Sequence, residues 1–199
     1  MHMRRLHFSR NIAFLLLLSL SACATPPRHI NNVCAVFDQR SGWFNNWHQA
    51  AYRVSAKYDI PVPILMATIR KESGFNADAR PPRKYLLGLI PWGYVSTANG
   101  FSQALDGTWD QYRRVTGNVM ARRSEFADAI DFVGWYYDKS ASLLNIPRDD
   151  VYHLYLAYYL GWSNYQRGAW LDNPAAQRLA QATAQMAADY ATQIQQCAL

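Results

Sequence analysis

Glutamate is almost missing from this 199-residue chain, which contains only Glu72 and Glu125. Lysine and arginine outnumber the acidic residues, 20 against 14, but no basic run is interleaved with aromatic residues, so no nucleic-acid partner is expected. Cysteine is also scarce, and none of the three has a second ligand at metal-site spacing. The sequence therefore predicts no metal and no cofactor, and it directs attention to the two glutamates.

Glu72 ends an apolar stretch with helical periodicity. Thr68, Ile69 and Glu72 share one helix face, because residues three and four apart are neighbours. Gly74 favours a left-handed stop, which places Glu72 near the negative end of the helix dipole. Apolar surroundings and the dipole both disfavour a carboxylate, so we expect a raised pKa and a carboxyl suited to general acid catalysis. The alternative is a glutamate that only caps the helix.

Residues 1–22 are predicted to be a leader. Three arginines precede an apolar run that is too short to span a bilayer. Residues 20–23, Leu-Ser-Ala-Cys, resemble the cleavage box of bacterial lipoproteins. That resemblance implies an acylated Cys23 and a membrane anchor, followed by a tether over residues 23–33 and a domain over residues 34–199. A plain signal peptide with an unmodified Cys23 is the alternative.

The residues after the leader bear on location and redox state. Ala24, rather than Asp, favours the outer membrane in enteric-type sorting, so the lipoprotein resemblance implies an anchor there, facing the periplasm of a Gram-negative bacterium. Cleavage lowers the formal net charge from +6 to +3, because the leader holds three arginines and no acid. In an oxidising compartment Cys34 and Cys197, which flank the folded region, are expected to pair. Two unpaired buried thiols are the alternative.

Most of the mature sequence has helical periodicity. Apolar residues recur every three or four positions in six segments, with Pro, Gly, Asn or Asp at many of the boundaries. Only residues 79–99, rich in Pro and Gly, lack this period. The expected fold is a single all-α domain with one long irregular loop or small hairpin region. Helices are expected around residues 47–58, 63–73, 106–115, 126–137, 150–160 and 174–197.

Three short motifs follow one another along the chain. They are residues 72–76, Glu-Ser-Gly-Phe-Asn; residues 100–103, Gly-Phe-Ser-Gln, with Thr108; and residues 157–161, Ala-Tyr-Tyr-Leu-Gly. Here the chain resembles the lysozyme-like lytic transglycosylases of the soluble lytic transglycosylase (SLT) family, whose signature runs E-S-x-F-N, G-L-M-Q-x-x-P-x-T and A-Y-N-A-G. The resemblance covers roughly residues 47–197.

The chain also departs from that signature. Ser102 replaces the usual Met, and Tyr159 and Leu160 replace Asn and Ala. The gap from Glu72 to Gln103 is longer than in the family. The segments 79–83, 87–92 and 126–136 resemble a lipoprotein branch of the family.

The family resemblance implies a lysozyme-like fold and cleavage of the β-1,4 bond between N-acetylmuramic acid and N-acetylglucosamine in peptidoglycan glycan strands. Glu72 would protonate the glycosidic oxygen and then, as a carboxylate, take the proton of the muramic C6 hydroxyl. That hydroxyl attacks C1 and leaves a 1,6-anhydro end. Gln103 would hold substrate amide or hydroxyl groups, and Tyr158 would bond Glu72 or the acetamido group. A helix-capping Gln103 and a core Tyr158 are the alternatives.

Five further residues are predicted to contact substrate. Ser73 belongs to the first motif, and Ser96 is the nearest match for a serine that the family places near its glutamate. Trp92, Tyr94 and Trp162 lie in expected loops or at helix ends, where rings can stack on sugar faces. The alternative is that these rings pin loops to the core.

Two other functions remain open at this level. A hydrolytic muramidase would use Asp78 or Asp106 to activate water, and a non-catalytic lipoprotein would bind the cell wall with the same fold. Only the transglycosylase yields anhydro ends, so its products distinguish it from the muramidase. No acid occurs between Asp78 and Asp106, so one carboxyl that acts twice fits the residues present.

Overall fold

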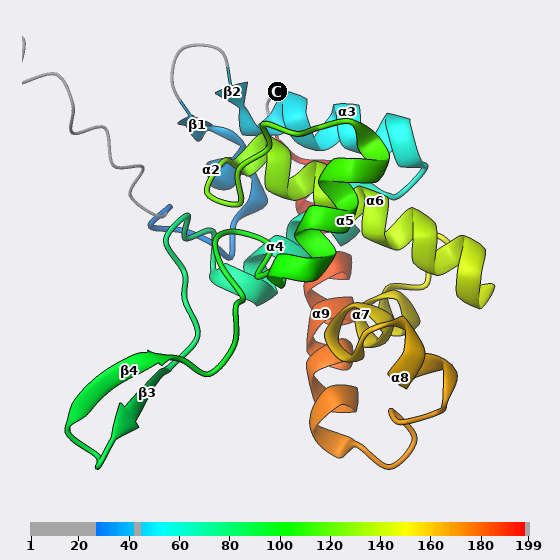
Figure 1. The fold of residues 1–199 in the computed structure, drawn as a ribbon. Coiled ribbons are helices and arrows are strands. Elements are labelled where there is room, and N and C mark those ends of the chain that lie inside the picture. Colours follow the sequence, from blue (N-terminus) through cyan, green and yellow to red (C-terminus); the bar gives the residue numbers. More distant parts are fainter. Residues whose placement is uncertain (1–26, 42–44, 198–199) are drawn as a thin grey trace, which may run out of the picture.

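The computed structural model describes residues 27–41 and 45–197, so the leader and Cys23 lie outside the described residues. Helices dominate this part of the chain, together with two short antiparallel strand pairs (Figure 1). The predicted all-α class is confirmed. The elements are α2 (Val33–Phe37), β1 (Arg40–Ser41), β2 (Asn45–Asn46), α3 (Trp47–Tyr58), α4 (Val62–Ser73), β3 (Arg83–Leu86), β4 (Ile90–Tyr94), α5 (Asp106–Thr116), α6 (Phe126–Leu144), α7 (Val151–Leu160), α8 (Trp162–Gln166) and α9 (Pro174–Ile194).

Helix α4 forms the centre of the domain. Its residues 64–69 are all buried, and α3, α6 and α9 pack against it. Pro63 stands in the first turn, where its missing N–H costs no helical hydrogen bond. Gly74 ends the helix in the left-handed region, with a φ of 59°. A buried helix with defined ends gives the residues of its last turn a rigid support.

Four buried aromatic rings hold the chain on both sides of the segment between α4 and α5. Trp47, at the start of α3, stacks on Phe126, at the start of α6, with ring centroids 4.1 Å apart. Phe75 follows α4, and its ring lies 5.9 Å from Trp47. Phe101 follows the β3–β4 segment and lies 5.3 Å from Trp47. This cluster fixes the positions at which the first two motifs enter the domain.

Strands β3 and β4 form a hairpin that extends away from the helices (green, lower left in Figure 1). Its register runs from Arg83 opposite Tyr94 at the root to Leu86 opposite Ile90 near the tip. Every residue of β4 is exposed. The hairpin lies inside residues 79–99, the segment that the sequence sets apart from the helices. None of the helices in the described ranges is long and apolar enough to cross a bilayer.

The last helix holds the beginning of the domain. A disulfide joins Cys34 in α2 to Cys197, just after α9, over a sequence separation of 163. The backbone N–H of Val33 donates to the side-chain oxygen of Gln193 at 2.8 Å. The hydroxyl of Tyr190 donates to the carbonyl oxygen of Ile30. Covalent and polar contacts therefore fasten the N-terminal segment to α9.

Candidate active site

Glu72 lies in the last turn of α4, one residue before the helix ends. The N–H of Gly74 bonds the carbonyl oxygen of Arg70 at 2.9 Å and closes that turn. Glu72 keeps partial solvent exposure, whereas Thr68, one turn earlier on the same face, is fully buried. Glu72 therefore stands at the boundary between the core and the surface, with its carboxyl surrounded by protein.

Tyrosine hydroxyls from α6 and α7 gather around this carboxyl. Tyr155 donates a hydrogen bond to Oε1 of Glu72 at 2.8 Å. Tyr137 shares a hydrogen bond of 2.7 Å with Thr68. Burial first, and then the negative charge of Glu72, raise the pKa values of Tyr155 and Tyr158 well above the usual range. These phenols therefore keep their protons at neutral pH, and they can orient a carboxylate but not act as bases.

The pKa of Glu72 is strongly raised. Burial raises it from an ordinary value of 4.5 to about 7. The hydrogen bond from Tyr155 and the positive charge of Lys71 lower the pKa, but their combined effect is smaller than that of burial. Near neutral pH the side chain is thus divided between its acid and its carboxylate forms. A group in this state is suited both to giving a proton and to taking one back.

The hydroxyl that bonds Glu72 belongs to Tyr155, whereas the sequence suggested Tyr158 for this contact. Both residues lie on α7, three positions apart and therefore close together on its surface. The hydroxyl of Tyr158 donates instead to the carbonyl oxygen of Ser102, at 2.5 Å. Of the two contacts that the resemblance implied for Tyr158, the bond to Glu72 is therefore made by Tyr155. The inward face of the helix includes both Tyr155 and Tyr158, so the sequence held no local signal that separates them. Contact between Tyr158 and a substrate acetamido group stays a prediction.

Gln103 closes the base of the hairpin segment. Its side-chain nitrogen donates to the carbonyl oxygens of Ala79 at 3.0 Å and Gly100 at 2.8 Å. The N–H of Gly100 bonds the Ala79 carbonyl at 3.0 Å, so two hydrogen bonds join the two ends of the hairpin segment. Neither contact of Gln103 caps a helix. Since the nitrogen is engaged in these bonds, the side-chain oxygen is the atom that is left for a substrate donor.

Arg123 packs against the backbone of the second motif. Gly100 has a φ of +70°, and a Cβ at this position would lie 2.2 Å from the carbonyl oxygen of Arg123. The same carbonyl accepts the N–H of Phe101 at 3.1 Å. The guanidinium of Arg123 binds the carbonyl oxygen of Ala104 at 2.8 Å and the carboxylate of Asp106 at 2.6 Å. This close approach explains why the motif begins with glycine.

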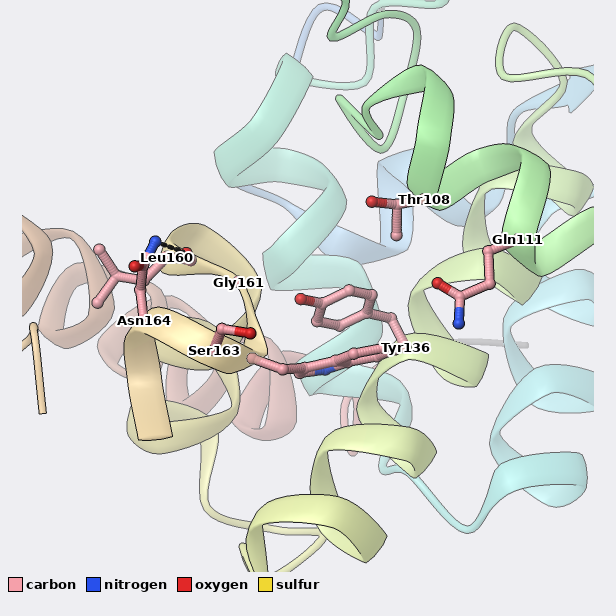
Figure 2. Close-up of a pocket in the computed structure, with 8 residues that line it drawn as sticks. Thr108, Gln111, Tyr136, Leu160, Gly161, Ser163 and Asn164 are labelled. Atoms are coloured by element: carbon pink, nitrogen blue, oxygen red, sulfur yellow. Dashed lines mark hydrogen bonds between the residues drawn. The ribbon is translucent and has the colours of Figure 1, made fainter. Parts of the chain in front are cut away.

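A cavity of about 240 Å³ lies between the second and third motifs. Figure 2 shows Thr108 and Gln111 of α5 on one side, and on the other the corner of α7 and α8, with Leu160, Gly161, Ser163 and Asn164. Trp162 lines the cavity, and its ring stacks on Tyr136 with centroids 4.6 Å apart. Thr108 and Gly161 thus bring two motifs that are distant in sequence to one cavity.

Aromatic rings connect this cavity to Glu72. Tyr136 lies edge-on to Tyr158 at 5.0 Å, and Tyr158 lies 6.4 Å from Tyr155, which holds the carboxyl. Trp162 also donates its indole N–H to the hydroxyl of Ser140 at 2.9 Å, so its orientation is fixed. The carboxyl and the cavity are therefore linked by one run of packed rings.

The two predicted serines make local contacts. The hydroxyl of Ser73 donates to the carbonyl oxygen of Ile69 at 3.1 Å, on its own helix. Ser96 is exposed in the segment after β4, where its hydroxyl accepts the N–H of Ala98 at 3.3 Å. Neither contact involves Glu72, and the substrate contacts of both serines stay predictions.

The two predicted aromatic residues of β4 belong to the hairpin. Trp92 is exposed. The ring of Tyr94 lies against the guanidinium groups of Arg80 and Arg83, at 5.6 and 5.4 Å. Their contacts with substrate also stay predictions.

Comparison with known protein families matches residues 11–197 to a family model described as transglycosylase SLT domain. A comparison with curated proteins finds no matching relative. The matched span contains the three motifs, the Tyr155–Glu72 pair and the cavity beside Trp162.

Proposed function

The chain belongs to the transglycosylase SLT domain family and is a lytic transglycosylase acting on peptidoglycan, and from this premise we propose its bond specificity and mechanism. It cleaves the β-1,4 bond between N-acetylmuramic acid and N-acetylglucosamine and leaves a 1,6-anhydro end. The observation that carries this proposal is the single carboxyl of Glu72, with a pKa of about 7, held by the hydroxyl of Tyr155.

Two proton transfers at one carboxyl complete the reaction. Protonated Glu72 gives its proton to the glycosidic oxygen as the bond to C1 breaks. The resulting carboxylate takes the proton of the muramic C6 hydroxyl, whose oxygen then forms the new bond to C1. Glu72 ends the cycle protonated, as it began. A pKa near neutrality serves both steps, because neither form of the group is strongly disfavoured. Tyr155 keeps the carboxyl in one orientation throughout.

The hydrolytic alternative requires a second carboxylate beside the bond. Inverting and retaining glycosidases place two carboxyl groups across the scissile linkage. Asp106, one of the two acids considered for that task, is paired with Arg123 at 2.6 Å. Asp78, the other, is exposed and lies in a turn, where its N–H bonds the side chain of Asn76 at 2.9 Å. The ion pair of Asp106 favours the reaction in which the sugar supplies its own nucleophile.

Product analysis in ¹⁸O water tests the proposal. Purified sacculi digested with the protein in labelled water should release muropeptides with anhydro ends and without ¹⁸O at the muramic C1, because no water enters the reaction. A digest by a hydrolytic lysozyme under the same conditions should carry the label. Incorporation of ¹⁸O at C1 by this protein would show that it is a muramidase.

Tyr155→Phe should move the pH profile of the reaction. The hydroxyl of Tyr155 lowers the pKa of Glu72, so its loss raises that pKa above about 7. Activity requires the protonated acid and is lost as the pH rises through this pKa, so the alkaline limb of kcat/KM should shift to higher pH. The rate at the optimum should fall about 10–100-fold, the effect of losing one hydrogen bond to a charged group.

Tyr158→Phe is the matched control for that experiment. Tyr158 lies one turn further along the same helix, but its hydroxyl bonds Ser102 rather than Glu72. Its replacement should leave the alkaline limb in place. The hydrogen bond from Tyr155 to Glu72 would be contradicted if the alkaline limb of kcat/KM stayed fixed in Tyr155→Phe. It would also be contradicted if that limb moved equally in both variants.

We further propose that the protein is a lipoprotein of the outer membrane, anchored through Cys23 and facing the periplasm. The Leu-Ser-Ala-Cys sequence at residues 20–23 supports this, and so does a substrate that lies in the cell wall. Metabolic labelling with a palmitate analogue should mark the parent protein, and the mark should disappear in Cys23→Ser. Equal labelling of both proteins would contradict the anchor.

A further inference from the structure

The β3–β4 hairpin carries a dense group of exposed apolar side chains. Seven of the fifteen large apolar residues that are exposed in the described chain lie between positions 85 and 95. Single exposed apolar residues are common on protein surfaces, but a continuous group marks a surface with a partner. Leu87 and Leu89 at the tip are 87% and 84% exposed, and Trp92 is 71% exposed.

These side chains follow an order from the tip of the hairpin to its root. Leu87 and Leu89 flank Gly88 at the tip. The aromatic residues Tyr85 and Trp92 come next, one on each strand. The root holds a group of three basic residues, Arg80, Arg83 and Lys84, beside Tyr94.

The basic residues of the root are available to an anionic partner. None of the ion pairs found among the described residues involves Arg80, Arg83 or Lys84. The guanidinium groups of Arg80 and Arg83 lie over the ring of Tyr94, at 5.6 and 5.4 Å. The hairpin therefore combines an apolar tip with basic side chains at its root that have no acidic partner among the described residues.

This order matches the depth profile of a lipid leaflet. A strand rises about 3.4 Å per residue, so the tip leucines lie about 14 Å beyond Arg83. Apolar groups at a membrane surface enter about 5–10 Å, aromatic rings collect at the interface, and basic residues face anionic headgroups. We propose that the hairpin inserts its tip into an anionic bilayer surface, with the three basic residues at the lipid phosphates.

The exposure of both faces of the hairpin favours lipid over a flat protein surface. Successive side chains of a strand point to opposite faces, and every residue of β4 is exposed. A flat partner covers only one of these faces and leaves the other in water. Lipid surrounds an inserted tip and covers both. A docked hairpin also fixes the active site relative to the membrane. Gln103, the last residue of the second motif, bonds the carbonyl oxygens of Ala79 and Gly100 at the base of the hairpin.

Site-directed spin labelling in the full chain tests this docking directly. Leu89→Cys adds a thiol for a nitroxide label to a protein in which Cys34 and Cys197 form a disulfide. The unsubstituted chain, treated in the same way, corrects for any label at Cys23. Met120→Cys is the matched control, because Met120 is also 84% exposed but lies between α5 and α6. The labelled proteins are reconstituted with vesicles of phosphatidylethanolamine and phosphatidylglycerol in a three-to-one ratio.

On vesicles, the label at position 89 should collide with dissolved oxygen and should be protected at least about five-fold from a water-soluble nickel reagent. The label at position 120 should stay accessible to the nickel reagent. Arg83→Gln combined with Lys84→Gln should reduce this protection. Glu72→Gln should leave it unchanged, so the result does not depend on the catalytic proposal. A label at position 89 that stays accessible on vesicles overturns docking. Protection without vesicles that grows with protein concentration, or protection only on sacculi, also overturns it, in favour of a second copy or of glycan.

Discussion

Glu72→Gln should leave a folded protein that releases muropeptides from sacculi at less than about a thousandth of the parent rate. General acid–base catalysis contributes about 10²–10⁴-fold for one role, and here one carboxyl performs both roles. Glutamine keeps the shape of the side chain, and its amide oxygen can still accept the hydrogen bond that Tyr155 now gives to Oε1 at 2.8 Å. The loss is therefore chemical rather than structural. A variant that retained a tenth of the rate would show that another group carries the proton.

The same substitution should stabilise the fold at alkaline pH. The pKa of Glu72 is about 7 in the folded protein and 4.5 ordinarily, so the unfolded chain ionises first as the pH rises. The free energy of unfolding therefore falls as the pH rises from about 4.5 to about 7, and it stays lower at higher pH. Glutamine does not ionise, so Glu72→Gln should gain about 1–3 kcal/mol at pH 8 and almost nothing at pH 4.

Melting curves of the two proteins at both pH values check this gain and serve as the folding control for the activity result. A melting temperature that fell at pH 8 would show that the substitution disturbs the site, and the lost rate would then have a structural cause. A raised melting temperature together with lost activity separates the proton transfer from the fold. It would also show that the buried carboxyl costs stability which its function requires.

The fold was largely predictable because its signals are local. The apolar periodicity of α4, the prolines before it and Gly74 after it specify a buried helix that ends beside Glu72. Each signal acts within a few residues of the feature that it determines. Residues 79–99 were set apart for the same reason, since a run rich in Pro and Gly cannot continue a helix.

The details of the site depend on contacts between distant segments, which local patterns do not contain. Tyr155 and Tyr158 share the inner surface of α7, and only the packing of that helix decides that Tyr155 reaches Glu72 across 83 residues of sequence. The engagement of Gln103 with Ala79 likewise requires that the chain return to its starting point after the hairpin. Neither placement follows from periodicity, because helix spacing determines a face and not the partner that the face meets.

Loss of the Cys34–Cys197 disulfide should cause the largest fall in stability of any single change away from the active site. The bond closes a loop with a sequence separation of 163, and the chain-entropy model assigns such a loop about 5 kcal/mol, as an upper bound. The contacts of Gln193 with Val33 and of Tyr190 with Ile30 remain after the bond is broken. These contacts should keep α2 on α9 at low temperature, so the folded enzyme should still be active there.

Thermal melting of Cys34→Ser, Cys197→Ser and the double variant measures this contribution. Both single variants should melt at similarly reduced temperatures, and the double variant should be no less stable than either, because each has lost the same single bond. Titration of the parent protein should detect no free thiol from this pair while it is folded and oxidised. Additive losses in the double variant would mean that each cysteine stabilises the fold by its own packing. In that case the link between α2 and α9 would rest on side-chain contacts rather than on the closed loop.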